Sequence, residues 1–201
     1  MIAVGWYRQG GKRAFDLVLA APLLVGTLPL ILLASAGVVL SSRGPAFFTQ
    51  ERIGLHGRPF KLFKLRTMVD EERDPTLQVH SRHASVTPLG AWLRRFKIDE
   101  LPQLWNVVRG QMSVVGPRPD LAENVRGYPA SAVPRLTVRP GLTGLAQVSG
   151  NALLSWEARW AIDVDYVNSV SLVGDIRILF HTIGVVLLGE RLATPPSVVE
   201  D

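Results

Sequence analysis

The strongest pattern in this chain is one long run of apolar residues near its N-terminus. Residues 17–40 hold no charged side chain over 24 positions, which exceeds the ~20 residues that a helix needs to cross the hydrocarbon core of a membrane. Pro22 and Pro29 interrupt the run, and each proline removes a helical hydrogen bond and clashes with the preceding turn. We therefore expect a membrane helix that bends near its middle.

Basic residues flank this apolar run on both sides. Arg8, Lys12 and Arg13 precede it, and Arg43, Arg52, Arg58, Lys61, Lys64 and Arg66 follow it. A spanning helix usually has its excess of Lys and Arg at one end only, so the flanks favour a re-entrant helix with both ends on the cytoplasmic face and its break at Leu28 and Pro29. A straight anchor with an outside N-terminus stays open as the alternative. A cleaved signal peptide is disfavoured by Asp16 and by the length of the run.

The rest of the chain predicts short elements around one core. Residues 46–50 and 57–65 read as two strands of a small hairpin, and the polar stretch 69–86 as a surface loop or a frayed helix. Thr87 and Pro88 form a helix start, a second helix is expected from Asp99, and residues 145–148 read as a short strand. Further helices are expected over 155–170 and 176–188, the last too short to span a membrane and suited to its interface. The predicted fold is mostly α with a small β-hairpin: a membrane segment over 1–42 and a compact cytoplasmic α/β catalytic domain over 43–201.

Composition adds a preference for anionic partners. The chain has 47% hydrophobic residues, no cysteine and a net charge of +5, and 18 of its 22 basic residues are arginine, whose planar fork suits phosphate. The absence of cysteine excludes disulfides and thiolate metal sites. The four histidines are scattered, with His80 and His83 as a weak metal pair at most. Nucleic acid is disfavoured because the aromatic residues do not alternate with basic ones.

Asp99 and Glu100 are the first candidates for chemistry. Adjacent carboxylates at a helix start point in different directions and can act as nucleophile and metal ligand. Alone, the pair is better explained without chemistry, by Asp99 as a helix cap and by Glu100 as an acid that matches the helix dipole in the first turn. Arg94, Arg95 and Lys97 just before the pair, and Arg118 between two prolines after it, suit a nucleotide diphosphate with a divalent ion. Some of these arginines are also explained as contacts with anionic lipid headgroups.

Seven stretches in order resemble the bacterial sugar transferase family, the monotopic phosphoglycosyl transferases. The matching stretches are 12–16, 44–54, 63–68, 99–106, 115–119, 138–150 and 163–167. They cover nearly the whole chain. The size of the chain and the stretch 150–157 are similar to minimal members that act on UDP-linked N-acetylated sugars, such as the bacillosamine-phosphate transferases.

The resemblance implies a site and a reaction. Asp99 is expected to be the covalent nucleophile and Glu100 the ligand of Mg²⁺, with Arg94 and Arg118 binding phosphate groups. Within the matched stretches, the further expected substrate-binding residues are Lys64, Arg66, Arg139 and Gln147. The implied reaction transfers a phosphosugar from a UDP-sugar to polyprenyl (undecaprenyl) phosphate, with release of UMP, and begins glycoconjugate or polysaccharide assembly at the bacterial inner membrane. Membrane lipids are implied partners, and a homodimer stays open.

The chain departs from the family pattern at two places. The family usually has Ser-Pro at the membrane break, where this chain has Leu28-Pro29, and the adjacent Thr27 is the candidate for the missing hydroxyl. The family usually has Asp or Glu at the position of Gln111, so a charge near the metal site is missing. Two other functions stay open: a membrane-anchored module that binds anionic lipid or nucleic acid without catalysis, and an inactive scaffold of glycan assembly.

Overall fold

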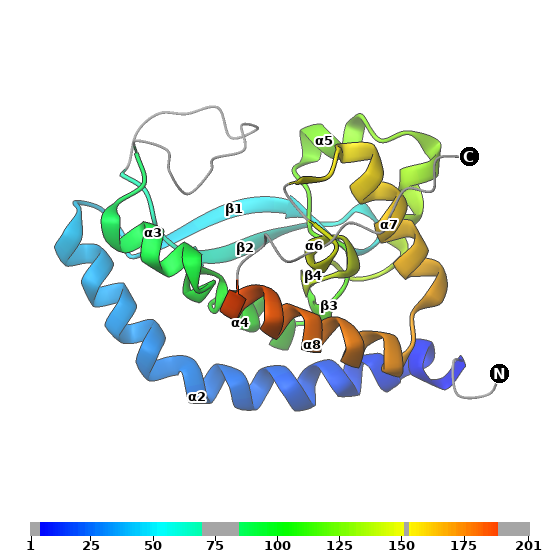
Figure 1. The fold of residues 1–201 in the computed structure, drawn as a ribbon, viewed down its shortest axis with the longest axis horizontal. Helices are drawn as coiled ribbons and strands as arrows, with labels where there is room; N and C mark the ends of the chain where they lie inside the picture. Colours follow the sequence, from blue (N-terminus) through cyan, green and yellow to red (C-terminus); the bar gives the residue numbers. More distant parts are fainter. Residues whose placement is uncertain (1–4, 70–84, 151–152, 189–201) are drawn as a thin grey trace.

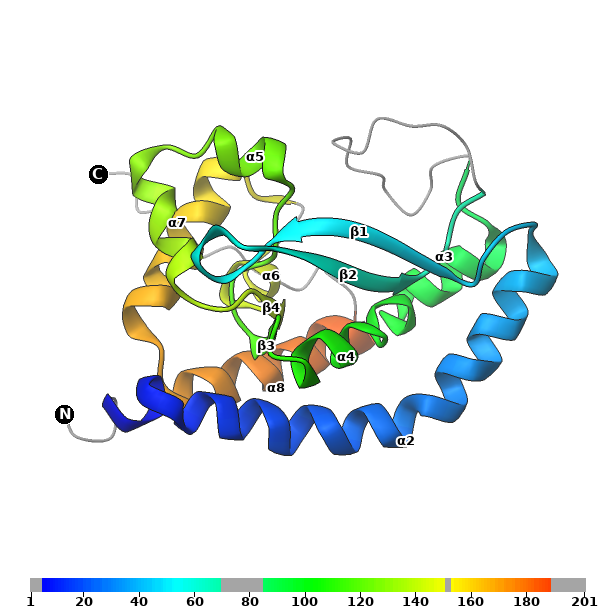
Figure 2. The same ribbon diagram turned by 180° about the vertical axis from the view of Figure 1, so that it is seen from behind.

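The computed structural model describes residues 5–69, 85–150 and 153–188, and His80 and His83 lie outside these ranges. Figures 1 and 2 show a long helix along one edge, a hairpin that runs back across the molecule, and short helices around a small second sheet. The elements are η1 (Tyr7–Gly11), α2 (Lys12–Ser41), β1 (Phe47–Ile53), η2 (Leu55–Gly57), β2 (Pro59–Leu65), α3 (Pro88–Arg95), η3 (Ile98–Glu100), α4 (Gln103–Val108), β3 (Ser113–Val115), α5 (Ala122–Arg126), η4 (Ala130–Thr137), β4 (Gly141–Thr143), α6 (Leu145–Val148), α7 (Trp156–Ser169) and α8 (Leu172–Leu188).

The predicted apolar helix is present and bent. Tyr7–Ser41 is the one helix among the described residues that is long and apolar enough to cross a membrane, by length and composition. Pro22 and Pro29 lie inside α2, and Figure 1 shows the helix bending near its middle without a break in the ribbon. The hydroxyl of Thr27 donates to the carbonyl of Leu23 at 2.6 Å. The sequence had suggested that this hydroxyl satisfies the carbonyl that Pro29 leaves without a helical donor. That carbonyl belongs to Val25, and Thr27 bonds to Leu23 in its place.

Buried polar contacts fasten the N-terminal end of α2 to the rest of the chain. The Lys12 ammonium and the Tyr7 hydroxyl both donate to Asp175 Oδ2, at 2.6 and 2.5 Å. Tyr166 donates to the other Asp175 oxygen at 2.9 Å, and Ser113 donates to Asp16 at 2.8 Å. A buried carboxylate is stable only when paired and hydrogen-bonded, so these contacts join α2 to β3, α7 and α8.

A single arginine holds the turn that follows the C-terminal end of α2. Arg66 follows β2, and its guanidinium donates to four main-chain carbonyls just after the helix: Ser42 at 2.9 Å, Arg43 at 2.7 Å, Gly44 at 3.2 Å and Pro45 at 2.7 Å. Helix ends leave carbonyls without a helical donor. Arg66 therefore holds the turn from α2 into β1.

The predicted hairpin is confirmed and extends further than the sequence indicated. β1 and β2 pair antiparallel from Phe47 opposite Leu65 to Ile53 opposite Pro59. Phe60 and Leu62 are buried in the core. Asn106 of α4 joins the hairpin to the helical layer, because its side chain accepts from the Phe63 amide at 3.2 Å and donates to the Lys61 carbonyl at 2.7 Å.

A second, two-stranded sheet was not predicted. β3 and β4 pair parallel, with Ser113 opposite Gly141 and Val115 opposite Thr143. The main-chain segments at Gly116 and Gly141 approach each other so closely that a Cβ at Gly141 would lie 2.1 Å from the Gly116 nitrogen. Glycine is needed here because two main chains approach each other. The close approach explains the glycines at positions 116 and 141.

Three other boundaries differ from the sequence predictions. Residues 145–148 form a helix, since Leu, Ala and Gln are good helix formers. α8 begins at Leu172, four residues earlier than predicted, with the hydroxyl of Ser171 accepting from the Gly174 amide at 3.2 Å. α4 begins at Gln103 and not at Asp99. The predicted start of α3 is confirmed, because the Thr87 hydroxyl accepts from the Gly90 amide at 2.9 Å.

Gly90 supplies a test of the packing of α3. A Cβ there would lie 2.0 Å from the Thr67 carbonyl oxygen, whereas a Cβ at Gly184 of α8 would meet nothing within 4 Å. We expect Gly90→Ala to lower the thermal unfolding midpoint in detergent by several degrees, because overpacking costs about 1–3 kcal/mol. The matched change Gly184→Ala should leave the midpoint unchanged or raise it slightly, since Ala favours helix over Gly. Equal midpoints for the two variants would contradict the close approach of α3 to Thr67.

Candidate active site

A tight turn between α3 and α4 places the two acidic residues. Lys97 adopts a left-handed conformation, with φ of 57° and ψ of 20°, which is uncommon for a residue with a side chain. The chain then forms the short 3-10 helix η3, which contains both Asp99 and Glu100, and neither caps a helix end. Capping therefore does not explain Asp99, whose Oδ1 is buried and has no hydrogen-bond partner among the described residues.

Two cations from distant parts of the sequence hold Glu100. Lys64 of β2 contacts Glu100 Oε1 at 2.7 Å, and Arg118 of the loop after β3 contacts the same oxygen at 3.3 Å. Burial opposes the ionisation of Glu100, but Lys64 and Arg118 outweigh it and hold the pKa of this carboxyl well below its usual value. Glu100 is thus a fixed negative charge, and the same ion pair raises the pKa of Arg118.

Asp99 has the opposite electrostatic character. Burial raises its pKa, and the neighbouring charge of Glu100 raises it further, while Lys64, Lys97 and Arg94 act in the lowering direction. Two adjacent carboxyls therefore differ: Glu100 is paired and ionised, and Asp99 is desolvated and more basic. Such a separation of pKa values between neighbouring carboxyls is typical of sites in which the two groups have different roles.

The structure brings the sequence-predicted residues together only in part. Lys64 and Arg118 contact Glu100 directly, and Arg94 lies within electrostatic range of Asp99, with its Nε donating to the Thr67 hydroxyl at 2.8 Å. Leu28 and Pro29 lie within α2, where they are exposed.

The other three predicted substrate residues make main-chain contacts elsewhere. Arg66 is buried against the carbonyls after α2. Arg139 donates from Nε to the Gly110 carbonyl at 2.9 Å, at the C-terminal side of α4. Gln147 donates to the Leu142 carbonyl at 3.1 Å, and its Oε1 has no hydrogen-bond partner among the described residues. The guanidinium groups of Arg66 and Arg139 thus bind main-chain carbonyls in the structure.

Gln111 lies in the hydrogen-bond network of Asn106. Its Oε1 accepts from Asn106 Nδ2 at 2.8 Å, and Asn106 in turn is bonded to β2. The neutral side chain therefore takes part in joining α4 to the hairpin.

The donor groups suit a magnesium ion that is shared with a substrate. The described residues contain no group of three or more Asp, Glu, His or Cys side chains placed to hold a metal. Mg²⁺ is commonly held by one or two carboxylates together with substrate phosphates. Asp99, with its unpartnered Oδ1, and Glu100 offer that donor set.

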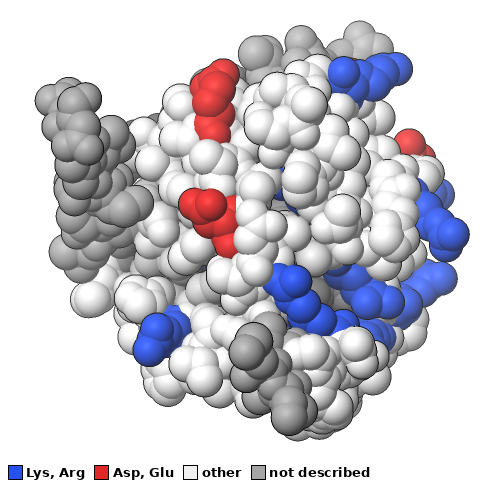
Figure 3. Space-filling model, turned by 90° about the vertical axis from the view of Figure 1, so that its right-hand side faces the viewer, with Lys and Arg blue, Asp and Glu red and all other residues white. Residues whose placement is uncertain are grey.

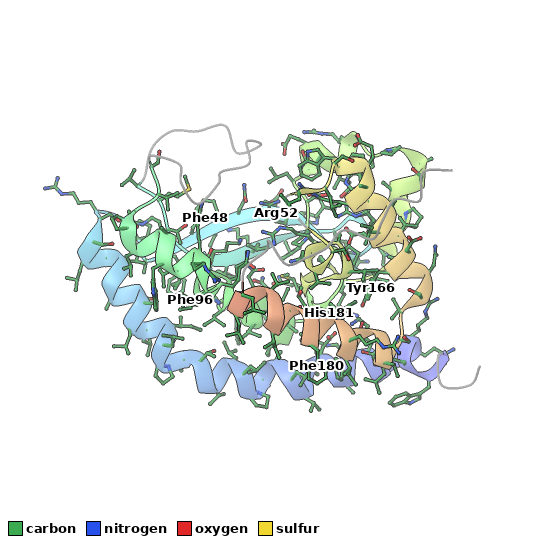
Figure 4. The ribbon with its side chains drawn as sticks, in the orientation of Figure 1. Phe48, Arg52, Phe96, Tyr166, Phe180 and His181 are labelled. Carbon is green, nitrogen blue, oxygen red and sulfur yellow. The ribbon has the colours of Figure 1, made fainter. Side chains whose placement is uncertain are left out.

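Two residues near the site were not singled out by sequence reasoning. Arg52, labelled in Figure 4, lies at the end of β1 and donates from Nη1 to the Pro119 carbonyl at 3.2 Å. Burial and the nearby Arg118 charge lower the pKa of Arg52 to about 10. Arg135 of η4 donates to the Arg118 carbonyl at 3.1 Å. Arg52 belongs to a matched stretch, but no local pattern marks Arg135, because its partners lie far from it in the sequence.

Comparison with known proteins identifies the family. The model of the bacterial sugar transferase family matches residues 7–189. The uncharacterised sugar transferase EpsL of Bacillus subtilis is 44% identical, over 90% of this chain and 89% of its own length. The exopolysaccharide production protein ExoY of Rhizobium meliloti is 42% identical, over 88% of this chain and 85% of its own. A UDP-glucose:undecaprenyl-phosphate glucose-1-phosphate transferase of Caulobacter vibrioides is 44% identical, over 86% of this chain and 68% of its own. The chain therefore belongs to the bacterial sugar transferase family.

Proposed function

We propose that the protein transfers a phosphosugar from a UDP-sugar to undecaprenyl phosphate, releases UMP, and passes through a phosphosugar covalently bound to Asp99. The names of relatives about 40% identical support the donor and the acceptor. The observation that carries the covalent step is the environment of Asp99. This carboxylate is desolvated, caps no helix, and lies next to a Glu100 that is held by two cations.

The proposed reaction consists of two displacements at one phosphorus atom. In the first, a carboxylate oxygen of Asp99 attacks the phosphorus that bears the sugar. The bond from this phosphorus to the bridging oxygen breaks, and UMP leaves with that oxygen. In the second, a phosphate oxygen of undecaprenyl phosphate attacks the same phosphorus. The bond to Asp99 breaks, which regenerates the carboxylate and leaves an undecaprenyl diphosphate sugar. A covalent intermediate divides one difficult transfer into two easier ones.

The cations of the site stabilise the negative charge of the diphosphate. Arg118 has a side chain that is 46% exposed, so its guanidinium can bind phosphate oxygens while it stays paired with Glu100. Lys64 is held by Glu100 close to Asp99. A magnesium ion held by Asp99 or Glu100 would supply further neutralisation of the phosphate charge.

The sugar is proposed from the names of relatives alone. Characterised relatives carry glucose or galactose in their names, whereas the stretch 150–157 suggested an N-acetylated sugar. We take UDP-glucose as the first donor to test, with UDP-galactose and UDP-N-acetylglucosamine beside it.

The apolar surfaces of three helices support a position in the membrane interface. α3 and α8 lie on the same face, in front of the hairpin in Figure 1 and behind it in Figure 2. Figure 4 shows Phe96 and Phe180 on that face. α8 carries large exposed apolar residues at helical spacing, at Val173, Ile176, Phe180, Ile183 and Leu187. Figure 3 shows that most of the basic side chains on this side of the molecule gather in the lower and right part of the view, and such a cluster suits anionic headgroups.

The contacts of α2 favour a re-entrant path over a span. Lys12 near one end of α2 is bonded to Asp175 of α8, and Ser42 just after the other end is bonded to Arg66. A straight span would separate these contacts by a hydrocarbon core ~30 Å thick. The same compact domain contacts both ends, so we propose that both lie on the cytoplasmic face of the inner membrane.

A membrane-anchored scaffold without catalysis is the second candidate. It would need the cations around Glu100 only to bind an anionic ligand, and it would not need Asp99. The buried Asp99 Oδ1 without a partner argues against this candidate. An unsatisfied buried polar atom destabilises a fold, and a catalytic role is one reason for which native proteins keep such an atom.

The first test is release of UMP from UDP-sugars by the purified protein with Mg²⁺ and undecaprenyl phosphate. We expect Asp99→Asn to lower the rate by at least about 10³-fold, since removal of a nucleophile abolishes most of the rate enhancement. Asp165→Asn, an exposed change on α7, is the matched control and should retain full activity. Chelation of Mg²⁺ should also stop release. Full activity of Asp99→Asn would eliminate the covalent step, and no release from any donor by folded protein would favour the scaffold.

The second test uses the pH dependence of kcat/KM. Asp99 must be ionised to attack, so a raised pKa moves the loss of activity at low pH upwards from the ordinary range near ~3.9. Lys64 acts to lower the pKa of Asp99, so Lys64→Met should move the acid limb to higher pH. Lys61→Met, an exposed change on the same strand, should leave the limb in place. A limb that stays or moves to lower pH in Lys64→Met would contradict the electrostatic role of Lys64.

The third test addresses topology in this cysteine-free chain. Single cysteines at Gln9, Arg43 and Glu123 can be labelled with a membrane-impermeant maleimide in inside-out and right-side-out vesicles. We expect all three positions to react from the cytoplasmic side only. Reaction of Gln9→Cys from the opposite side to the other two would establish a span and rule out the re-entrant path.

A further inference from the structure

The loop that carries Arg118 is held through four consecutive carbonyl groups. Each accepts one hydrogen bond, and the donors come from the end of β1, from η4 and from β4. The pairs are Pro117 with the Gly141 amide at 2.8 Å, Arg118 with Arg135 Nη2 at 3.1 Å, Pro119 with Arg52 Nη1 at 3.2 Å, and Asp120 with the Ile53 amide at 2.9 Å. These four bonds leave the main chain of residues 117–120 little freedom to move.

Arg135 is the most connected of these donors. Its guanidinium donates to Asp163 from Nε at 3.0 Å and to Asp120 from Nη1 at 2.8 Å, and it also contacts the Tyr128 hydroxyl. Arg135 is 5% exposed, and both carboxylates are buried. Burial works against the charged guanidinium, but Asp163, Tyr128 and Asp120 more than compensate and raise the pKa of Arg135. The group is therefore a charged, rigid fork whose orientation is set on three sides.

One donor of this fork reaches the carbonyl of the candidate phosphate-binding residue itself. The Arg118 side chain is 46% exposed, and within the part of the chain that the structure describes it has one ion-pair contact, to Glu100 at 3.3 Å. That single contact cannot fix a long flexible side chain by itself. The position of the Arg118 Cα atom is set by the main chain around it. Arg135 donates a hydrogen bond to the Arg118 carbonyl of that main chain.

We propose that Arg135 is a positioning residue for substrate binding, which sets the place of the Arg118 guanidinium through the Arg118 carbonyl. This inference rests on the proposed function, which gives Arg118 its contact with the diphosphate of the UDP-sugar. Arg135 is 5% exposed, so its effect on substrate binding is indirect and passes through Arg118. A displaced Arg118 guanidinium would lose part of its charge-assisted contact with the diphosphate, which weakens binding of the UDP-sugar.

The test is a double-mutant cycle between Arg135→Lys and Arg118→Ala, read as KM for the UDP-sugar and kcat of UMP release. Lysine keeps the charge between Asp120 and Asp163 but cannot reproduce the planar fork that also reaches the Arg118 carbonyl. We expect Arg135→Lys to raise KM about tenfold and to change kcat less than threefold. In the Arg118→Ala background, Arg135→Lys should change KM less than twofold, because a residue that acts through Arg118 has no effect once that guanidinium is absent. Arg126→Lys on the surface of α5 is the matched control and should change neither.

The possible outcomes distinguish a failure of this inference from a failure of the proposed function. Unchanged kinetics of Arg118→Ala would remove the substrate role of Arg118 from the proposed function, and this inference with it. An affected Arg118→Ala combined with equal effects of Arg135→Lys in both backgrounds would overturn the inference alone, because Arg135 would then act on stability or through other residues. If Arg135→Lys shows no cooperative thermal transition, Tyr128→Phe replaces it, since that change removes one contact of the fork. We then expect a two- to threefold rise in KM that disappears in the Arg118→Ala background, and equal rises in both backgrounds would overturn the inference.

Discussion

A buried carboxylate that must be paired with cations organises this protein. Glu100 is held by Lys64 from the hairpin and by Arg118 from the loop after β3, so three segments far apart in the sequence must meet at one oxygen atom. Removing one partner of a buried pair leaves an uncompensated charge. The left-handed turn at Lys97, the Asn106 link to β2 and the close crossing of Gly116 with Gly141 can each be understood as a means to that meeting.

The same pairing leaves the neighbouring carboxylate with a different chemistry. Because Glu100 takes both direct contacts, Asp99 keeps its burial and gains a negative neighbour, and its pKa rises while that of Glu100 falls. One side chain is thereby kept as a constant charge and the other as a reactive group. The division arises from which residue the cations reach, and adjacent positions in the sequence could not reveal it.

Local patterns predicted local structure well. The hairpin expected from residues 46–65, the helix start at Thr87 and Pro88 and the helix expected over 155–170 are all confirmed. The parallel pairing of β3 with β4 and the contacts of Arg135 were missed, because their partners are separated by many residues and no periodicity records them. The pair Asp99-Glu100 was found through ordered motifs that resemble a family. Local reasoning alone had favoured helix capping, and only the turn at Lys97 removed that explanation.

The arginine count was the least reliable guide to the site. A large share of arginine suggested phosphate binding, yet several arginines donate to main-chain carbonyls at helix ends. Arg8, Arg13 and Arg95 donate to carbonyls in the last turns of α7, α4 and α8, respectively. Arg66 donates to carbonyls of the turn after α2. Helices leave their last carbonyls without helical donors, and a planar fork can reach two of them at once. Composition therefore indicates that guanidinium groups are useful to the fold, without telling which of them meet a ligand.

The attachment of α2 at both ends changes what a truncated form of this protein would be. A helix that merely anchored the domain could be removed to yield a water-soluble enzyme. Here its removal would take away Lys12 and Tyr7, which neutralise and bond a fully buried Asp175, and Ala20 and Val38, which belong to the hydrophobic core. A form without this helix would therefore leave Asp175 without two of its hydrogen-bond donors and would open the core of the remaining domain, so the helix is part of the fold that positions the active site.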